Sequence, residues 1–210
     1  MRKLLVFSLA LGFLVSLSTR VPAEQEQQEN KTEEIKTAIQ DLGSDDVMVR
    51  REAAVTLTRS GPEAKEAIPE LLKTLQDEDP IVRQNSVDAI GEINSPSAMI
   101  VDALIPLLHD EEYLVRLKAA ETLGKFRQLS LKAEKPLLDL LKDPVPIVRG
   151  FAVEAVTKVL PFNKSTPVLI PLLKDPDWNV RRKATVALDT IGTPQALKAL
   201  EQNRNQGRKK

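Results

Sequence analysis

The sequence predicts an all-α protein, a solenoid of about five helical hairpins, and three observations favour this fold class. The 210-residue chain is 42% hydrophobic but only 3% aromatic and contains no Cys, which is typical of a folded chain without disulfides. The dipeptide Val-Arg recurs at intervals of 33, 33, 33 and 32 residues. Twelve, eleven and eight residues before this Arg, and seven residues after it, every repeat has an apolar residue. Such a period indicates a stack of similar helical units.

The first element in chain order is residues 1–23, which have the layout of a secretory signal peptide. Arg2 and Lys3 precede an apolar run over residues 4–17, and Val21–Ala23 is a small-x-small cleavage pattern. The run is shorter than the ~20 residues needed to span a bilayer. We therefore expect cleavage rather than retention as a membrane anchor, and a periplasmic or secreted protein with no transmembrane segment after cleavage.

The rest of the chain divides into a polar linker, the repeats and a basic end. Residues 24–31 contain no apolar residue and are expected to form a flexible tether. Residues 203–210 are polar and basic and are expected to form a flexible tail. The solenoid is predicted over residues 32–202, with repeats at about 32–62, 63–96, 97–130, 131–164 and 165–202.

Each repeat is predicted to contain a helix A, a tight turn and a helix B. Apolar residues twelve, eleven and eight positions before the Arg share one helical face, and those one before and three, seven and ten after it share another. Between the two stripes lies a polar break such as Asp143-Pro144, where Asp caps a helix and Pro fits only the first turn. Pro106 and Pro171 fall inside helix A and are expected to kink it.

Small residues predict close contact between successive B helices. The residues three and six positions after the repeated Arg are Ala, Ser or Thr in every repeat. One hairpin cannot cover its own apolar face, so stacked hairpins are expected to bury a continuous core.

The segment Leu172–Leu188, which reads LLKDPDWNVRRKATVAL, strongly resembles a HEAT repeat. Ala89–Ile93 and Ile191–Leu197 are similar to the short subclass of these repeats known from phycobilin lyases. The resemblance covers about residues 32–202 and is specific for fold but not for function. It implies a right-handed α-solenoid, an armadillo-like α-α superhelix, in which helix A is bent and the B helices line the concave surface.

The repeated Arg is the first candidate site. Six residues before it stands an Asp in four repeats, whereas the first repeat has Ser44. We expect each Arg to lie near the Asp of an adjacent turn, because a carboxylate can accept two bonds from one guanidinium. This structural ladder comprises Arg50, Arg83, Arg116, Arg149, Arg181, Asp77, Asp110, Asp143 and Asp175. The alternative, a stripe for phosphate, would need excess positive charge. The 30 basic and 30 acidic residues of the chain provide none, so no nucleic-acid partner is expected.

The second candidate site is the solvent face of helix B, formed by the residues two, five and nine positions after the Arg. Its charges are acidic in the second repeat and mostly basic beyond it, and mixed signs favour a protein or extended peptide over a polyanion. Phe151 stands out because it is a large apolar residue on a polar stripe. The candidate binding residues are Lys118, Glu121, Lys125, Phe151, Glu154 and Lys158. The alternative is an ordinary solvated face.

Tyr113 and Trp178 both lie three residues before the repeated Arg, at the turn into helix B. They are candidates for the rim of a binding face, because Trp and Tyr are enriched in interaction hot spots; packing against the next repeat is the alternative. His109 lies beside carboxylates in a turn, but it is the single His. We expect no metal, no cofactor and no catalytic residue.

Three functions remain in order of preference. The first is an exported, non-enzymatic and monomeric scaffold that binds a protein or extended peptide on its concave face. The second, implied by the resemblance, is a bilin lyase or chromophore-transfer chaperone; the export signal and the few aromatic residues count against it. The third is a nucleic-acid-binding solenoid, which the acidic second repeat disfavours.

Overall fold

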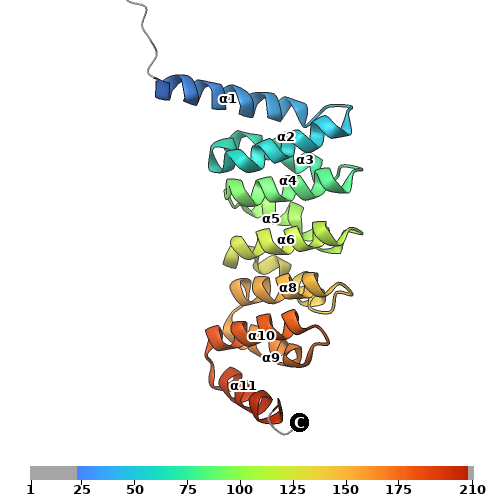
Figure 1. Ribbon diagram of the computed structural model, residues 1–210, viewed down its shortest axis with the longest axis vertical. Helices are drawn as coiled ribbons and strands as arrows, with labels where there is room; N and C mark the ends of the chain where they lie inside the picture. The colour runs from blue at the N-terminus through green and yellow to red at the C-terminus, as the bar shows by residue number, and fades with distance from the viewer. Residues whose placement is uncertain (1–22, 208–210) are drawn as a thin grey trace, which may run out of the picture.

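The structure, a computed structural model, describes residues 23–207, and this part of the chain is built of helices stacked along one axis (Figure 1). The proposed signal peptide lies outside the described residues, apart from its last residue, Ala23. Each of five hairpins contributes one long helix B, and each B helix packs against the B helix of the next hairpin. The B helices are α2 (Val47–Ser60), α4 (Pro80–Ile93), α6 (Tyr113–Lys125), α8 (Pro146–Val159) and α10 (Trp178–Ile191). Within residues 23–207, no helix is both long and apolar enough to cross a membrane.

Helix A is continuous only in the first hairpin, where it is α1 (Ala23–Asp41). In the other four hairpins an α-helical segment and a 3-10 segment follow one another. The break expected at Pro106 and Pro171 is present as a change of helix type just before each proline, because proline offers no N–H to the α-helical ladder. The split A helices are η1 (Gly61–Ala67) with α3 (Ile68–Thr74), α5 (Ala98–Leu104) with η2 (Ile105–His109), η3 (Arg127–Ala133) with α7 (Glu134–Leu140), and α9 (Phe162–Leu169) with η4 (Ile170–Lys174).

A single hydrophobic core runs the length of the stack between the A and B layers. The residue seven positions after the repeated Arg is fully buried in every hairpin, and these residues are Leu57, Ile90, Leu123, Val156 and Leu188. Burial of one such aliphatic side chain contributes about 1.5–3 kcal/mol. Because each hairpin presents its stripe to both neighbours, the core is shared between hairpins.

Successive B helices approach one another closely at small residues. A Cβ added at Gly91 would lie 2.7 Å from Thr122 Oγ1, and one added at Gly124 would lie 3.2 Å from the Cα atom of Ala155. Thr122 and Ala155 both stand six residues after the repeated Arg, where the sequence has only small side chains. The close contact therefore occurs at the positions that the repeat keeps small.

The N-terminal end differs from the sequence-based expectation. Residues 24–31 do not form a flexible tether; they are the first part of helix α1. Glu and Gln are good helix formers, and α1 is anchored further along, where Ile35, Ala38 and the following Leu42 are buried. Lys31 adds an ion pair to Glu63 of the second hairpin at 2.9 Å.

The C-terminal end also differs from the expectation. The last hairpin ends at Gly192, which has a left-handed backbone conformation (φ 64°). A separate helix, α11 (Pro194–Gly207), then packs on α10 and η4. Its buried face consists of Ala196, Ala199 and Leu200. Residues 203–207 are thus helical rather than part of a flexible tail, because they extend a helix that caps the open end of the core.

Candidate functional site

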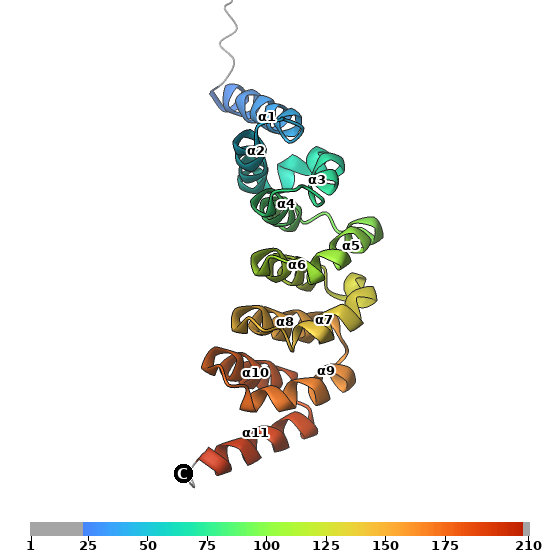
Figure 2. The same ribbon diagram turned by 90° about the vertical axis from the view of Figure 1, so that its right-hand side faces the viewer.

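The B helices lie on the concave side of the stack and the A helices on the convex side (Figure 2). The residues that the sequence analysis selects on helix B therefore share one face, and the turns between helix A and helix B, the A–B turns, lie along one edge of it.

Four of the five repeated arginines pair with an Asp of the following hairpin. Arg50 Nε donates to Asp77 Oδ2 at 2.8 Å, and Arg149 Nη2 donates to Asp175 Oδ1 at 2.7 Å. The same bidentate arrangement joins Arg83 to Asp110 and Arg116 to Asp143. These side chains are only 4–12% exposed. The ladder thus holds adjacent hairpins together.

Each ladder Arg also closes the turn of its own hairpin. Nη1 of Arg116, for example, donates to the carbonyl oxygens of Asp110 and Glu111 at 2.8 and 3.0 Å. Asp175 accepts the backbone N–H of Asp177 in addition to its bonds from Arg149. Burial alone would raise the pKa of Asp175, but the bonds from Arg149 and this N–H outweigh burial and lower it.

The ladder ends at Arg181. This Arg donates to the carbonyl oxygens of Asp175 and Pro176, but no described carboxylate lies within 4 Å of it. The other four guanidinium groups are engaged by carboxylates, so residues 23–207 contain no row of free arginines that could bind a chain of phosphates.

Two of the candidate lysines on the concave face are engaged in ion pairs between neighbouring hairpins. Lys118 Nζ lies 2.9 Å from Asp88 and 3.5 Å from Glu121, and Lys125 Nζ lies 2.7 Å from Glu92. Burial alone would lower the pKa of Lys118, but the two carboxylates outweigh it and raise that pKa. In the middle of the face these charges therefore brace one B helix against the next.

An open groove lies between α8 and α10, at the C-terminal end of the concave face. Its volume is about 330 Å³, and it is lined by Glu154, Thr157, Lys158, Arg182, Lys183, Val186, Ala187 and Thr190. Val186 is 56% exposed. The structure thus brings the candidates Glu154 and Lys158 together beside an accessible apolar side chain.

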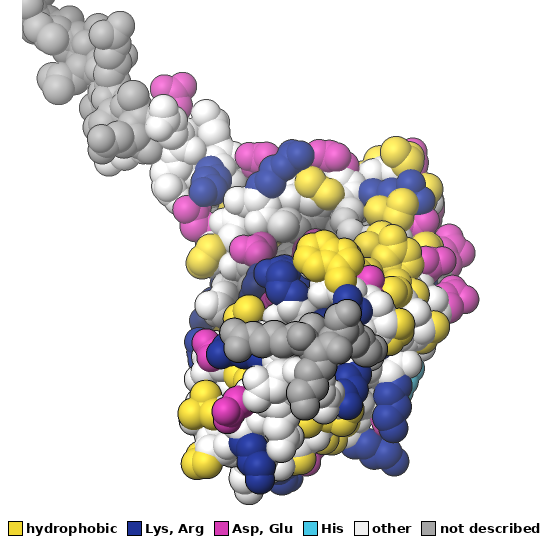
Figure 3. Space-filling model, turned by 60° about the horizontal axis from the view of Figure 1, so that its bottom comes forward, with side chains coloured by type: hydrophobic (Ala, Val, Ile, Leu, Met, Phe, Trp, Pro, Cys, Tyr) yellow, Lys and Arg dark blue, Asp and Glu magenta, His cyan; other side chains and the backbone are white. Residues whose placement is uncertain are grey.

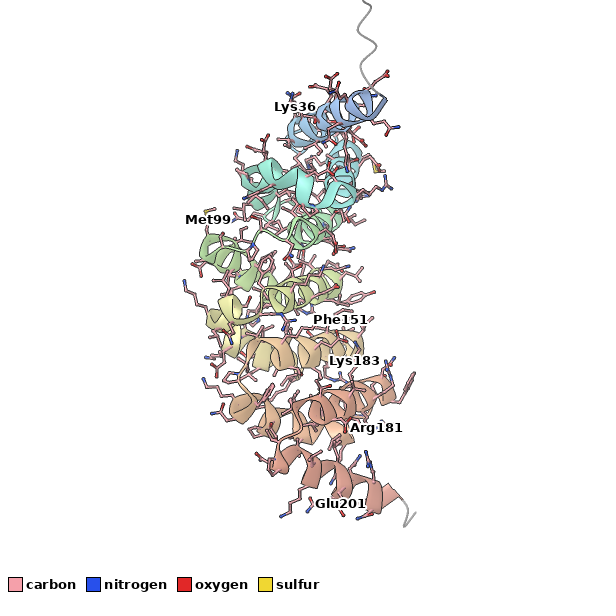
Figure 4. The ribbon with its side chains drawn as sticks, turned by 90° about the vertical axis from the view of Figure 1, so that its left-hand side faces the viewer. Lys36, Met99, Phe151, Arg181, Lys183 and Glu201 are labelled. Atoms are coloured by element: carbon pink, nitrogen blue, oxygen red, sulfur yellow. The ribbon has the colours of Figure 1, made fainter. Side chains whose placement is uncertain are left out.

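Phe151 does not stand free beside this groove. Lys183 Nζ lies 4.6 Å from the centre of its ring and is also paired with Glu154. The two side chains extend from adjacent helices on the concave side, opposite Met99 of the convex layer (Figure 4). Phe151 is therefore half-buried under Lys183, and Val186 is the accessible apolar group of the groove.

Tyr113 and Trp178 are exposed at the first residues of α6 and α10. Trp178 is 61% exposed, so packing against a neighbouring hairpin does not account for its position. His109 is exposed at the end of η2. Within residues 23–207, no group of three His, Cys, Asp or Glu side chains is placed to hold a metal ion.

Sequence reasoning missed the pairs that cross from one B helix to the next, although the signal was available. Glu92 and Lys125 stand nine residues after the Arg in consecutive repeats and carry opposite charges. Arg51, one residue beyond the first ladder Arg, also pairs with the following hairpin, through Asp79 (Nε to Oδ1, 2.9 Å).

Stacked helical hairpins with a shared core and an Arg–Asp ladder define an α-solenoid repeat protein. A family model described as HEAT repeats matches residues 35–101, 68–155 and 134–209. The chain belongs to the HEAT-repeat family. No curated protein matches the sequence.

Solved structures show the same fold. The complex of CpcE and CpcF of phycocyanin lyase from Nostoc sp. PCC7120 is 23% identical with a TM-score of 0.66, covering 77% of this chain and 66% of that chain. A designed armadillo repeat protein in complex with the peptide (KR)4 is 20% identical with a TM-score of 0.56, covering 86% and 95%. An engineered protein is 22% identical with a TM-score of 0.62, covering 81% and 85%.

Proposed function

We propose that this protein is an exported, non-enzymatic scaffold that binds a protein or extended peptide through the concave face of its B helices. The observation that carries the proposal is the groove between α8 and α10, which is open to solvent and combines Val186 with charged side chains. Its volume of about 330 Å³ suits a few side chains of an extended segment.

The charges of the groove indicate the chemistry of that segment. Glu154 is neutralised by Lys183, whereas Lys158 and Arg182 have no ion-pair partner among residues 23–207. An acidic side chain on the partner would pair with either cation, and an aliphatic side chain would cover Val186. The favoured partner is therefore a segment that carries carboxylate and aliphatic side chains.

Rigidity supports a role in binding. The ladder and the shared core fix the B helices before any partner arrives, so binding orders little of the protein itself. The designed armadillo protein that holds (KR)4 shows that a solenoid of this shape can hold a peptide. Lys158 and Arg182, which have no ion-pair partner within the described part of the chain, favour an acidic segment rather than that basic one.

A photo-crosslinking residue introduced at position 186 in the source cell tests the proposal. The matched control carries it at position 99, because Met99 is equally exposed but lies on the convex layer. We expect protein adducts from position 186 that position 99 does not give, recovered from the periplasmic or secreted fraction. Identical adducts at both positions, or adducts confined to the cytoplasm, would contradict the groove or the export.

A chromophore-binding function is the second candidate, because a phycocyanin lyase complex shares the fold. Mixing the purified protein with a free bilin distinguishes the two functions. A shift in the bilin absorbance that Val186→Asp abolishes and Met99→Asp does not would favour the second candidate.

A further inference from the structure

Exposed apolar side chains recur along the edge of the stack formed by the A–B turns. Two residues before the repeated Arg, four hairpins present a large aliphatic side chain that is between 37% and 61% exposed: Met48, Ile81, Leu114 and Ile147. We call these four residues the turn-edge row. Figure 2 faces this edge, and Figure 3 shows hydrophobic side chains gathered on the corresponding side of the surface.

Packing within the chain does not require these side chains to be apolar. The next residue in each hairpin is the Val of the repeated Val-Arg, which points into the stack; Val82, Val115 and Val148 are fully buried. Helix B begins one residue before the row residue in each of these hairpins and would tolerate a polar residue there. Tyr113 and Trp178 extend the exposed apolar surface at the same helix ends. Exposed apolar groups that line up over several repeats mark an interaction surface.

Carboxylates flank the row in the first three hairpins. Glu78 and Glu111 approach the ladder arginines only at 3.6 Å, and their side chains are 89% and 82% exposed. Asp45, Asp46 and Glu112 have no ion-pair partner among residues 23–207. No Lys or Arg occurs within residues 44–49, 77–82 or 110–115, and Arg51, whose Nη1 lies 3.6 Å from Met48 Sδ, is paired with Asp79. The edge is thus apolar and negatively charged, so it would repel an anionic lipid surface or a nucleic acid.

We propose that the turn-edge row binds a positively charged amphipathic helix of another protein. The apolar face of that helix would cover Met48, Ile81 and Leu114, and its Lys or Arg residues would pair with the flanking carboxylates. Packed helices lie about 8–10 Å apart, and seven residues of an α-helix advance about 10.5 Å. A helix with an apolar residue at every seventh position therefore meets one member of the row in each hairpin.

This surface is separate from the concave groove, which favours an acidic segment. The two proposals are independent: a partner helix on the edge needs neither Val186 nor Arg182. The edge also has its own sequence signal, because the row and its carboxylates recur with the 33-residue period of the first three hairpins.

The binding of synthetic peptides to a protein of residues 23–207 tests the proposal. The probe is a 25-residue helical peptide with Leu along one face at heptad spacing and Lys on both sides of it. The comparison peptides replace Lys by Glu, or scatter the same Leu and Lys residues around the helix. We expect the patterned Lys peptide to bind at least tenfold more tightly than either comparison peptide, with an affinity that falls as salt rises.

Variants of the protein locate the site. Ile81→Ser combined with Leu114→Ser should weaken binding at least tenfold, whereas Met99→Ser on the convex layer and Val186→Asp in the groove should leave it unchanged. Circular dichroism checks that each variant is folded. Equal binding of the Lys and Glu peptides, equal binding by all variants, or loss of binding only in Val186→Asp would overturn the proposal.

Discussion

Neighbouring carboxylates of one A–B turn have opposite environments. Asp110 is 7% exposed and accepts two bonds from Arg83 of the preceding hairpin, whereas Glu111, the next residue, is 82% exposed and lies 3.6 Å from that guanidinium. Asp77 and Glu78 show the same difference. The inner carboxylates join hairpins to one another, while the outer ones are exposed to solvent. Recurrence of a charged residue in a repeat therefore does not by itself mark a binding site.

Removing an inner carboxylate should have the largest effect. Asp110→Ala leaves the buried guanidinium of Arg83 and the backbone N–H of Glu112 without their acceptor, and loss of one partner of a buried pair costs about 3–5 kcal/mol. The free energy of unfolding in urea measures this loss. The matched control, Glu111→Ala, should change that free energy by no more than about 0.5 kcal/mol. Equal effects of the two substitutions would show that the difference in burial between Asp110 and Glu111 does not decide their contributions to stability.

Acid should weaken the ion pairs between arginine and aspartate of adjacent hairpins before it unfolds the helices themselves. The bond from Arg51 lowers the pKa of Asp79 to about 2, with further bonds from the N–H groups of Val82 and Ile81, and Arg149 lowers that of Asp175. A carboxyl whose pKa is lower in the folded state stabilises that state fully above its unfolded pKa, near 4. This contribution is lost as the pH falls from about 4 through about 2.

The thermal unfolding midpoint measured between pH 7 and pH 2 checks this expectation. The midpoint should fall by several degrees between pH 4 and pH 2. Asp79→Asn should start from a lower midpoint at pH 7 and lose less in the same interval, because it has no proton to take up at position 79. A parallel decline in both proteins would show that Asp79 does not contribute to the acid sensitivity.

The sequence was sufficient to predict the hairpins, because the same apolar pattern, which has to be buried in the same way, occurs in all five repeats. The apolar residue seven positions after the Arg is buried in every hairpin, and Pro106 and Pro171 predict the break in helix A of the third and fifth hairpins. The ends could not be predicted in the same way. No second copy of residues 24–31 or 203–207 exists in the repeat, so composition alone suggested flexibility where the chain continues helices α1 and α11.

The candidate site was less predictable for a geometric reason. Side-chain type placed Phe151 on the concave face, but only the structure shows Lys183 over its ring. Lys118 and Lys125 lie on the concave face as expected, yet each is paired with a carboxylate of the preceding hairpin. Whether a side chain is free to bind depends on its neighbour in the adjacent repeat, and the sequence of a single repeat does not contain that neighbour.

The smallest effect should be at the open end of the ladder. Among residues 23–207, Arg181 has no carboxylate partner of the kind that the other repeated arginines have, but it donates to the carbonyl oxygens of Asp175 and Pro176. Arg181→Ala should therefore lower the free energy of unfolding by about 1–2 kcal/mol, the contribution of those two bonds. Arg116→Ala, which also orphans the buried Asp143, should cost about 3–5 kcal/mol. Urea unfolding of both variants measures the difference. If Arg181→Ala lost as much free energy of unfolding as Arg116→Ala, the repeated Arg would stabilise the protein mainly by closing its own turn and not by joining the hairpins.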